Sequence, residues 1–137
     1  MKVIKNPERI LIIRLSAIGD VVDVLPALRC LRSNFPKSRI SWLVEDKASA
    51  ILSGLPDIDD IIVFPRKKWQ REILKAKKTV RTLSDILSFY RRLRRERYDL
   101  VLDFQGNLKS GIMDLLTGTK NRVGFGKGFS KEFNYLF

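Results

Sequence analysis

The fold is decided by the stretch Ile10-Leu11-Ile12-Ile13-Arg14-Leu15-Ser16-Ala17-Ile18-Gly19-Asp20, in which an apolar run leads directly into a turn of small residues. Residues 9–15 have the near-continuous hydrophobicity of a strand that is buried on both faces. Apolar side chains at helical spacing follow over residues 21–34, so Asp20 is expected where that helix begins. In an open α/β sheet this arrangement places a carboxylate at the carboxyl end of the first strand, where such folds bind ligands.

Strands and helices alternate along the rest of the chain. Four further strands are expected at Arg39–Glu45, Asp60–Phe64, Asp99–Phe104 and Arg122–Phe125. Helices are expected between them over residues 46–53, 82–97 and 111–117. Pro26 is expected to bend the 21–34 helix unless a helix begins close to it. The alternation predicts an α/β domain over residues 1–137, a Rossmann-like parallel sheet of about five strands flanked by helices.

The composition is typical of a soluble globular protein rather than a disordered or membrane-spanning one, with 45% hydrophobic and 31% charged residues. No apolar run approaches the ~20 residues of a spanning helix, and the N-terminus lacks the pattern of a signal peptide. Cys30 is the only cysteine and histidine is absent, which excludes an intrachain disulfide and histidine chemistry and favours the cytosol.

The positive charge is concentrated in one part of the chain. The net charge is +12, and residues 66–97 carry thirteen Lys or Arg side chains against three acidic ones. Such a block forms either two solvated helix faces or a surface that faces an anionic partner. Residues 66–81 show no apolar stripe, so a loop or a loosely held helix is expected there, poorly ordered without a ligand. Trp42 is expected in the core, whereas Trp69 lies among the cations and is interpreted as a membrane or sugar contact.

The turn after the first strand allows two interpretations of Asp20. Of the glycines that a dinucleotide fingerprint needs only Gly19 is present, and the Gly-Lys-Ser/Thr of a P-loop is absent. Asp20 is therefore either the N-cap of the following helix or a general base, although a helix N-terminus favours the ionised carboxylate. The pattern Asp57-Ile58-Asp59 matches the Asp-x-Asp with which some sugar transferases hold a divalent cation. It lies between Pro56 and a strand, so it is interpreted as a turn without a metal.

A polar loop follows the fourth strand and reads Asp103-Phe104-Gln105-Gly106-Asn107-Leu108-Lys109-Ser110. In the expected strand order the fourth strand lies beside the first, so polar groups of this loop are predicted to line the same crevice as Asp20. The alternative is a hydrogen-bonded connection in which Gly106 supplies a turn.

Six segments then occur in order between about residue 10 and residue 125. They are Ile12–Asp20, Leu25–Leu28, Ile40–Glu45, Tyr98–Gly106, Lys109-Ser110 and Arg122–Phe125. Together they resemble the ADP-heptose:lipopolysaccharide heptosyltransferases, a family of inverting glycosyltransferases. Each segment alone is a weak signal, whereas the shared order and spacing make the resemblance specific.

This resemblance implies the N-terminal half of a GT-B fold, in which two Rossmann-like domains face each other across a cleft. The N-terminal half would bind the anionic inner core of lipopolysaccharide as the acceptor, and a C-terminal domain, absent from this chain, would hold ADP-heptose. Asp20 would be the catalytic base that removes a proton from the acceptor hydroxyl. The acceptor-binding residues would be Ser16, Gly19, Lys67, Lys68, Arg71, Gln105, Gly106, Lys109 and Ser110. Neither a metal nor a cofactor is implied for this fold type.

The resemblance also implies a cytoplasmic enzyme of lipopolysaccharide biosynthesis that contacts the inner face of the inner membrane peripherally. Without the donor domain, the polypeptide alone is expected to have no transferase activity. The alternative is a basic nucleic-acid-binding module, suggested by the run Arg91-Arg92-Leu93-Arg94-Arg95. Aromatic residues are sparse near these charges and no recognised binding motif is present, so no nucleic-acid partner is expected.

Overall fold

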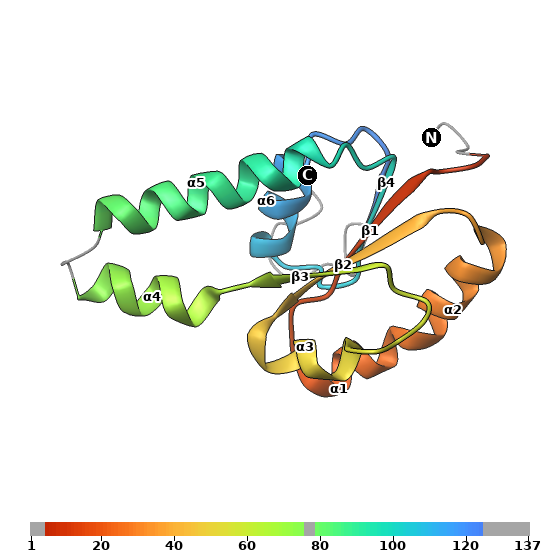
Figure 1. Cartoon of the computed structure of the whole chain (residues 1–137), viewed down its shortest axis with the longest axis horizontal. Helices are drawn as coiled ribbons and strands as arrows, with labels where there is room; N and C mark the ends of the chain where they lie inside the picture. The colour runs from red at the N-terminus through yellow and green to blue at the C-terminus, as the bar shows by residue number, and fades with distance from the viewer. Residues whose placement is uncertain (1–4, 76–78, 125–137) are drawn as a thin grey trace.

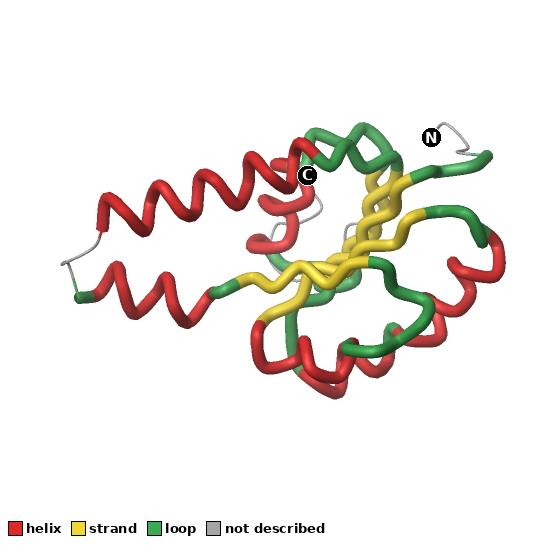
Figure 2. Tube along the Cα trace, in the orientation of Figure 1, coloured by secondary structure: helices red, strands yellow, loops and turns green. Residues whose placement is uncertain are grey.

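The computed structural model describes residues 5–75 and 79–124, which form a parallel β-sheet between two layers of helices (Figure 1, Figure 2). The five strands are β1 (Arg9–Ile13), β2 (Arg39–Glu45), β3 (Asp60–Phe64), β4 (Leu100–Asp103) and β5 (Arg122–Val123). Their order in the sheet is β3-β2-β1-β4-β5, and every neighbouring pair is parallel, which confirms the predicted α/β fold. The strand order reverses between β1 and β4, and sheets of this kind bind ligands outside the carboxyl ends of the strands at that point.

Three helices cover each side of the sheet (Figure 1). On one side lie α1 (Ile18–Asp23), α2 (Leu25–Asn34) and α3 (Asp46–Leu52). On the other side lie α4 (Arg66–Leu74), α5 (Thr79–Arg95) and α6 (Leu108–Leu116). Helices α4 and α5 pack against each other as a hairpin that extends beyond the end of the sheet (Figure 1).

The core has two halves because the side chains of the central strands alternate between the faces of the sheet. Ile10 and Ile12 of β1 pack with Trp42 of β2 on the side of α1, α2 and α3. Leu11 and Ile13 point the other way and pack with buried residues of α4, α5 and α6. All five side chains are fully buried, so the predictions of a strand buried on both faces and of a core tryptophan at this position are confirmed.

The helix expected over residues 21–34 is in fact two helices. The second begins at Leu25, which places Pro26 in its first turn, where the missing N–H costs no helical hydrogen bond. Pro26 therefore lies at the start of a helix and does not bend one. The sequence had allowed this exception, for the case that a helix begins close to Pro26. Helix α1 begins earlier than expected, with Ala17 as its N-cap, so the interpretation of Asp20 as the N-cap was wrong.

Helix α4 occupies the stretch for which the sequence predicted a loop or a loosely held helix. Its anchor is Trp69, which is 7% exposed and packs edge-on against Phe64 and Phe89 at ring-centroid distances of 5.2 and 5.5 Å. The interpretation of Trp69 as an exposed membrane or sugar contact was therefore wrong. A single large aromatic side chain can hold a short helix whose other residues are charged, which an apolar-stripe criterion overlooks. Residues 76–78 of the same stretch lie outside the described residues.

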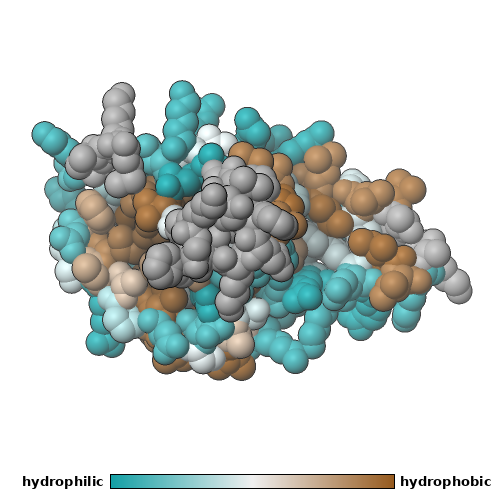
Figure 3. Space-filling model, turned by 180° about the vertical axis from the view of Figure 1, so that it is seen from behind, coloured by the Kyte–Doolittle hydropathy of each residue, from teal (hydrophilic) through white to brown (hydrophobic). Residues whose placement is uncertain are grey.

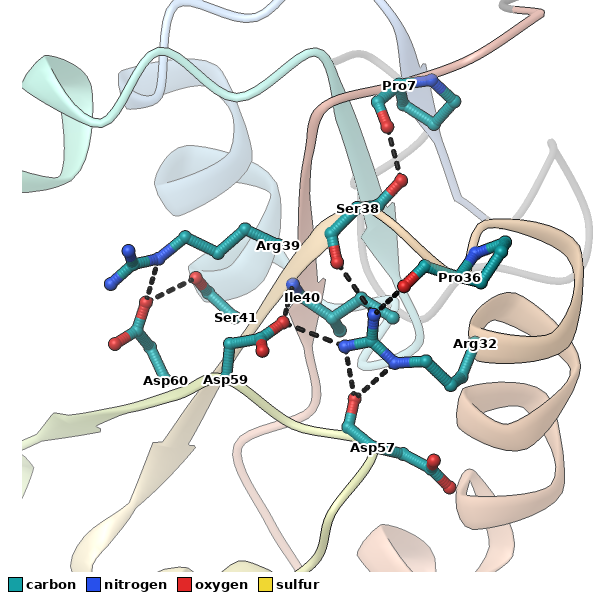
Figure 4. A network of polar contacts seen from close by, with 10 residues as sticks. All are labelled: Pro7, Arg32, Pro36, Ser38, Arg39, Ile40, Ser41, Asp57, Asp59 and Asp60. Atoms are coloured by element: carbon teal, nitrogen blue, oxygen red, sulfur yellow. Dashed lines mark hydrogen bonds and ion pairs between the residues drawn. The ribbon is translucent and has the colours of Figure 1, made fainter.

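The turn before β3 is held by Arg32 and two aspartates (Figure 4). Arg32 Nη2 donates to the carbonyl oxygen of Asp57 at 2.9 Å and to Asp59 Oδ2 at 2.8 Å, and this Oδ2 also accepts the backbone N–H of Ile40 at 2.7 Å. Partial burial acts to raise the pKa of Asp59, but the two hydrogen bonds outweigh it and the pKa lies below its ordinary value. The Asp57-Ile58-Asp59 pattern thus belongs to a structural turn, as predicted.

Candidate functional site

Asp20 lies in the first turn of α1, shortly after the carboxyl end of β1. Its Oδ2 accepts the backbone N–H of Ala17 at 3.1 Å, so the carboxylate closes the start of its own helix from the third helical position. The side chain is 47% exposed and therefore reaches solvent. The segments that directly follow the carboxyl ends of β1, β2 and β4 are called the carboxyl edge from here on. Asp20 lies at this edge, where the sequence placed it.

Arg14 links Asp20 to the loop on the other side of the switch point. Its Nη2 lies 2.5 Å from Asp20 Oδ2, and its Nη1 donates to the carbonyl oxygen of Phe104 at 2.5 Å. The Arg14 side chain is only 11% exposed, and its Nε is buried with no hydrogen-bond partner in the described part of the chain. A charge-assisted contact of this geometry fixes the direction in which the Asp20 carboxylate points.

Gln105 joins the loops that follow β1 and β4. Its Oε1 accepts the backbone N–H of Leu15 at 2.9 Å and that of Ser16 at 3.3 Å. Because β1 and β4 are parallel neighbours, both loops leave the sheet at the same edge. These contacts place the loop after the fourth strand beside the turn that precedes Asp20, as the expected strand order implied, and the shared crevice stays a prediction.

Asp103 shapes the same loop from inside the protein. Its Oδ1 accepts the backbone N–H groups of Gln105 at 2.8 Å and Gly106 at 3.1 Å. Its Oδ2 accepts the hydroxyl of Ser110 at 2.8 Å. Ser110 is fully buried, so its hydroxyl holds the loop to the first turn of α6. Gly106 has a φ of 65°, which supplies the turn that the alternative interpretation of this loop required.

Glu45 gathers two cations at the end of β2. Lys109 Nζ lies 2.5 Å from Glu45 Oε1, and Arg66 Nη1 lies 3.5 Å from the same oxygen. Lys109 stands in the first turn of α6, which begins at Leu108 and not at residue 111 as expected. Arg66 is the first residue of α4. The Glu45 carboxylate thereby ties both helices to the carboxyl edge.

Lys67 adds an unbalanced positive charge at this edge. The neighbouring ammonium of Lys47, on α3, lowers the pKa of Lys67, and the more distant carboxylates of Asp46 and Glu45 offset this only in part. Both lysines are exposed, and within the described residues neither forms a salt bridge. Two ammonium groups held close together produce a local positive potential that favours the approach of an anion.

The predicted acceptor-binding residues fall into four groups. Ser16, Gln105, Gly106 and Lys109 have polar contacts at the carboxyl edge, and Lys67 of α4 lies near Lys47 at the start of α3. Gly19 lies in the exposed first turn of α1, where a Cβ would meet no atom within 4 Å. Ser110 is turned inward to Asp103. Lys68 and Arg71 are exposed on α4, and no polar contact described for them joins them to this edge.

Five residues of the site were not named from the sequence as catalytic or binding residues, although one of them opens the loop that was predicted to line the crevice: Arg14, Glu45, Lys47, Arg66 and Asp103. The sequence could have indicated Arg14, because a charged residue in an apolar strand is buried only where it has a partner. Asp103, at the end of a buried strand, could have been indicated in the same way. Nothing in the sequence indicated Glu45 and Lys47, since their partners Lys109 and Lys67 come from helices distant in the sequence.

Taken together, the strand order and the polar groups outside the switch point define a Rossmann-like domain with a candidate ligand site at its carboxyl edge. Residues 86–137 match glycosyltransferase family 9, the heptosyltransferases. Over 124 residues the chain is 33% identical to lipopolysaccharide heptosyltransferase 1 of Campylobacter coli, which covers 90% of this chain and 32% of that protein. Over 131 residues it is 27% identical to the lipopolysaccharide core heptosyltransferase OpsX of Haemophilus influenzae, covering 96% of this chain and 34% of that protein.

Solved structures agree with these relatives. The Escherichia coli heptosyltransferase WaaC with ADP-2-deoxy-2-fluoro heptose superposes with a TM-score of 0.78 at 27% identity, covering 93% of this chain and 40% of that one. A family 9 glycosyltransferase of Veillonella parvula shares the fold, with a TM-score of 0.66 at 20% identity over 93% of this chain and 35% of that one. Over 90% or more of its length the chain is therefore similar to heptosyltransferases, and residues 86–137 match the model of that glycosyltransferase family. It spans about a third of the length of the relatives it matches.

Proposed function

We propose that this chain is the acceptor-binding part of a heptosyltransferase that transfers heptose from ADP-heptose to the inner core of lipopolysaccharide. Asp20 takes the proton of an acceptor hydroxyl, whose oxygen then bonds to the anomeric carbon of the heptose. The bond from that carbon to the diphosphate breaks, and ADP leaves with the electron pair. Residues 1–137 correspond to about a third of the length of the heptosyltransferases they match, so these residues alone are not expected to catalyse transfer.

The position of Asp20 is the observation that carries this proposal. A half-exposed carboxylate stands beside the switch point, and Arg14 and the N–H of Ala17 fix its direction. A general base must be within hydrogen-bond reach of the proton it removes, so a fixed and accessible carboxylate at a ligand edge suits the task. The loop beside it is held by Gln105 and Asp103, which makes the acceptor surface rigid.

The cations of the carboxyl edge suit the acceptor chemistry. An inner-core saccharide carries carboxylates and phosphates, and such groups would relieve the repulsion between Lys47 and Lys67. Lys109 is already engaged by Glu45, so in the described residues it is Lys67 that offers the less compensated charge.

The experiment is calorimetric titration of a deacylated lipopolysaccharide inner-core fragment into the chain. We expect Lys67→Gln to weaken binding about 5- to 20-fold, the size of one charge-assisted contact. Arg29→Gln, which removes an exposed cation on α2, is the matched control and should leave the affinity unchanged. Duplex DNA is titrated over the same salt series. Tight DNA binding together with no binding of the core fragment would favour the nucleic-acid module and refute the acceptor role.

We also propose a cytoplasmic location with peripheral contact to the inner face of the inner membrane, made through the α4–α5 hairpin. Val80, Leu83 and Leu87 lie on one face of α5 and are 84%, 55% and 51% exposed, and Leu74 at the end of α4 is 84% exposed. Figure 3 shows hydrophobic residues gathered over the hairpin, with hydrophilic surface beside them. Exposed cations flank them at Arg71, Lys75 and Arg81. An apolar face bordered by cations is the pattern of a helix that binds an anionic lipid surface.

In the described residues, no helix is long and apolar enough to cross a membrane.

Co-sedimentation with vesicles tests the hairpin. Vesicles of phosphatidylcholine with phosphatidylglycerol should retain the chain, and Leu83→Gln/Leu87→Gln should reduce retention about tenfold or more because apolar burial in the bilayer is lost. Ile112→Gln/Leu115→Gln, which alters exposed apolar residues on α6, is the matched control. If the vesicles retained both double variants equally, the membrane contact of the hairpin would be refuted. The proposal that Asp20 is the catalytic base would not be affected by this result.

A further inference from the structure

A polar cavity lies at the edge of the sheet opposite to Asp20. Its volume is about 680 Å³, and its walls are the carboxyl-terminal turn of α5 with the following residues 97–99, and the loop 117–121 between α6 and β5. The chain enters β4 at Leu100 and β5 at Arg122 directly after these walls, so the cavity sits at the amino ends of both strands. Nothing in the proposed transfer reaction uses this place.

Cations converge on the cavity without compensation. Five of its lining side chains are positively charged, namely Arg91, Arg94, Arg95, Arg97 and Lys120. No salt bridge or side-chain hydrogen bond of these five is present in the described part of the chain. The one carboxylate in the lining is Asp99, and its Oδ2 already accepts the backbone N–H groups of Glu8 at 2.8 Å and Arg9 at 2.9 Å.

The wall opposite the arginines is rigid and close. Gly118 has a φ of 73°, and a Cβ added there would lie 3.4 Å from Arg94 Cζ, so the backbone turn packs directly on the guanidinium. The Thr119 hydroxyl donates to the carbonyl oxygen of Tyr98 at 2.9 Å. The Asn121 side-chain amide donates to the carbonyl oxygen of Asp99 at 3.1 Å. The loop therefore contacts the exposed Arg94 guanidinium without supplying a counter-charge.

Arg97 supports a binding role independently of the charge count. It has a φ of 49°, a left-handed conformation that helices commonly place just past their end and that glycine adopts without strain. Cations in the last turn of a helix are favoured by the helix dipole, which accounts for Arg94 and Arg95. The helix dipole does not explain why an arginine stands at position 97, where the left-handed conformation favours glycine. A ligand that binds the Arg97 guanidinium would explain it.

We propose that this cavity binds a phosphate-bearing anion with more than one negative charge. Arginine guanidinium groups form paired hydrogen bonds with phosphate oxygens, and several arginines around one cavity suit a diphosphate or two nearby phosphates. The phosphate belongs either to a soluble compound or to a lipid headgroup.

Calorimetric titration of inorganic pyrophosphate into the chain tests the site. Arg94→Gln/Lys120→Gln should weaken pyrophosphate binding at least about tenfold, whereas Arg29→Gln/Lys37→Gln, which removes the same charge from exposed positions elsewhere, should change it less than about twofold. Equal weakening of pyrophosphate binding in both double variants would overturn the proposal. It would also be overturned if the unmodified chain gave no heat of binding and Arg94→Gln/Lys120→Gln did not change retention by vesicles.

Arg97→Gly separates binding from folding. Glycine suits the left-handed position, so the melting temperature should stay the same or rise while pyrophosphate binding weakens. Arg97→Gly with unchanged binding would count against the site.

Vesicles containing phosphatidylglycerol distinguish the two sources of the phosphate, a lipid headgroup and a soluble compound. Loss of retention in Arg94→Gln/Lys120→Gln but not in Arg29→Gln/Lys37→Gln identifies a lipid headgroup, and pyrophosphate binding with unaltered retention identifies a soluble phosphate. Both results support the site.

Discussion

Arg14 connects the two strands that flank the switch point, and it does so with a single side chain. It pairs with Asp20 on the β1 side and donates to the carbonyl oxygen of Phe104 on the β4 side. The sequence predicted the place of Asp20, because an apolar run followed by small residues fixes where the first strand ends. It did not predict the link that Arg14 makes, because Phe104, the partner of Arg14 on the β4 side, is ninety residues away from Arg14 along the chain.

Replacing Arg14 by glutamine should therefore lower the free energy of unfolding by about 1–3 kcal/mol. The reason is that the Phe104 carbonyl oxygen and the Asp20 carboxylate both lose a charged donor in a largely buried place. Thermal or denaturant unfolding measures the change, and Arg29→Gln on the exposed face of α2 should stay within about 0.5 kcal/mol. Equal stability of the two variants would show that Arg14 does not join the loops.

Asp114 makes the free energy of unfolding depend on pH. It is 6% exposed, its Oδ1 has no hydrogen-bond partner in the described residues, and burial raises its pKa to about 7 against the opposing charge of Arg122. The folded protein thus keeps a proton that the unfolded chain loses from about pH 4 upward. Unfolding free energy should accordingly fall as the pH rises from about 4 to 7, and the contribution of Asp114 should level off above that.

Asp114→Asn should remove this slope and stabilise the protein above pH 7 by about 1–3 kcal/mol. Urea unfolding of both proteins at several pH values measures it, and Asp23→Asn at an exposed position is the control. A variant whose stability parallels that of the unmodified chain at every pH would rule out a buried, protonated Asp114.

At the scale of elements, helices were predicted well where their apolar side chains repeat and poorly where one side chain anchors them. Helix α5 has apolar side chains that repeat at helical spacing and was expected, apart from its first three residues. Helix α4 lacks such a pattern and depends on Trp69, whose partners Phe64 and Phe89 belong to β3 and α5. From the sequence, a new helix near Pro26 was only the alternative to a bend in one long helix. Whether proline bends or starts a helix depends on where the helix begins, which the sequence did not decide.

Trp69→Ala should lower the free energy of unfolding by about 3–5 kcal/mol and speed amide hydrogen exchange over residues 66–74. The cause is loss of the aromatic cluster that joins α4 to the rest of the protein. Leu74→Ala on the same helix is the matched control, since Leu74 is 84% exposed. Fast exchange over 66–74 already in the unmodified chain would instead support the loosely held helix that the sequence suggested.

For the whole molecule, alternation of strands and helices was enough to predict the sheet, its parallel sense and the edge near which Asp20 lies. The predicted loop contacts at that edge follow from strand order alone. The pairing of Glu45 with Lys109 and the nearness of Lys47 to Lys67 do not, because they depend on how helices on different parts of the sheet are inclined. Positive charge, visible in the sequence as one block, is divided in the structure between the carboxyl edge, the α4–α5 hairpin and the cavity at the opposite edge.

The central claim is that Asp20 is the catalytic base, and its most direct test is kcat in a chimera that joins this chain to the remaining part of Escherichia coli WaaC. With ADP-heptose and acceptor saturating, Asp20→Asn should lower kcat by about 10²–10⁴-fold, because asparagine cannot accept the proton. Acceptor affinity should change little, and unfolding free energy should fall by no more than ~1 kcal/mol, the usual worth of a half-exposed ion pair. An unchanged kcat in a chimera that is active would contradict the account and leave Asp20 as a residue that only closes the start of α1.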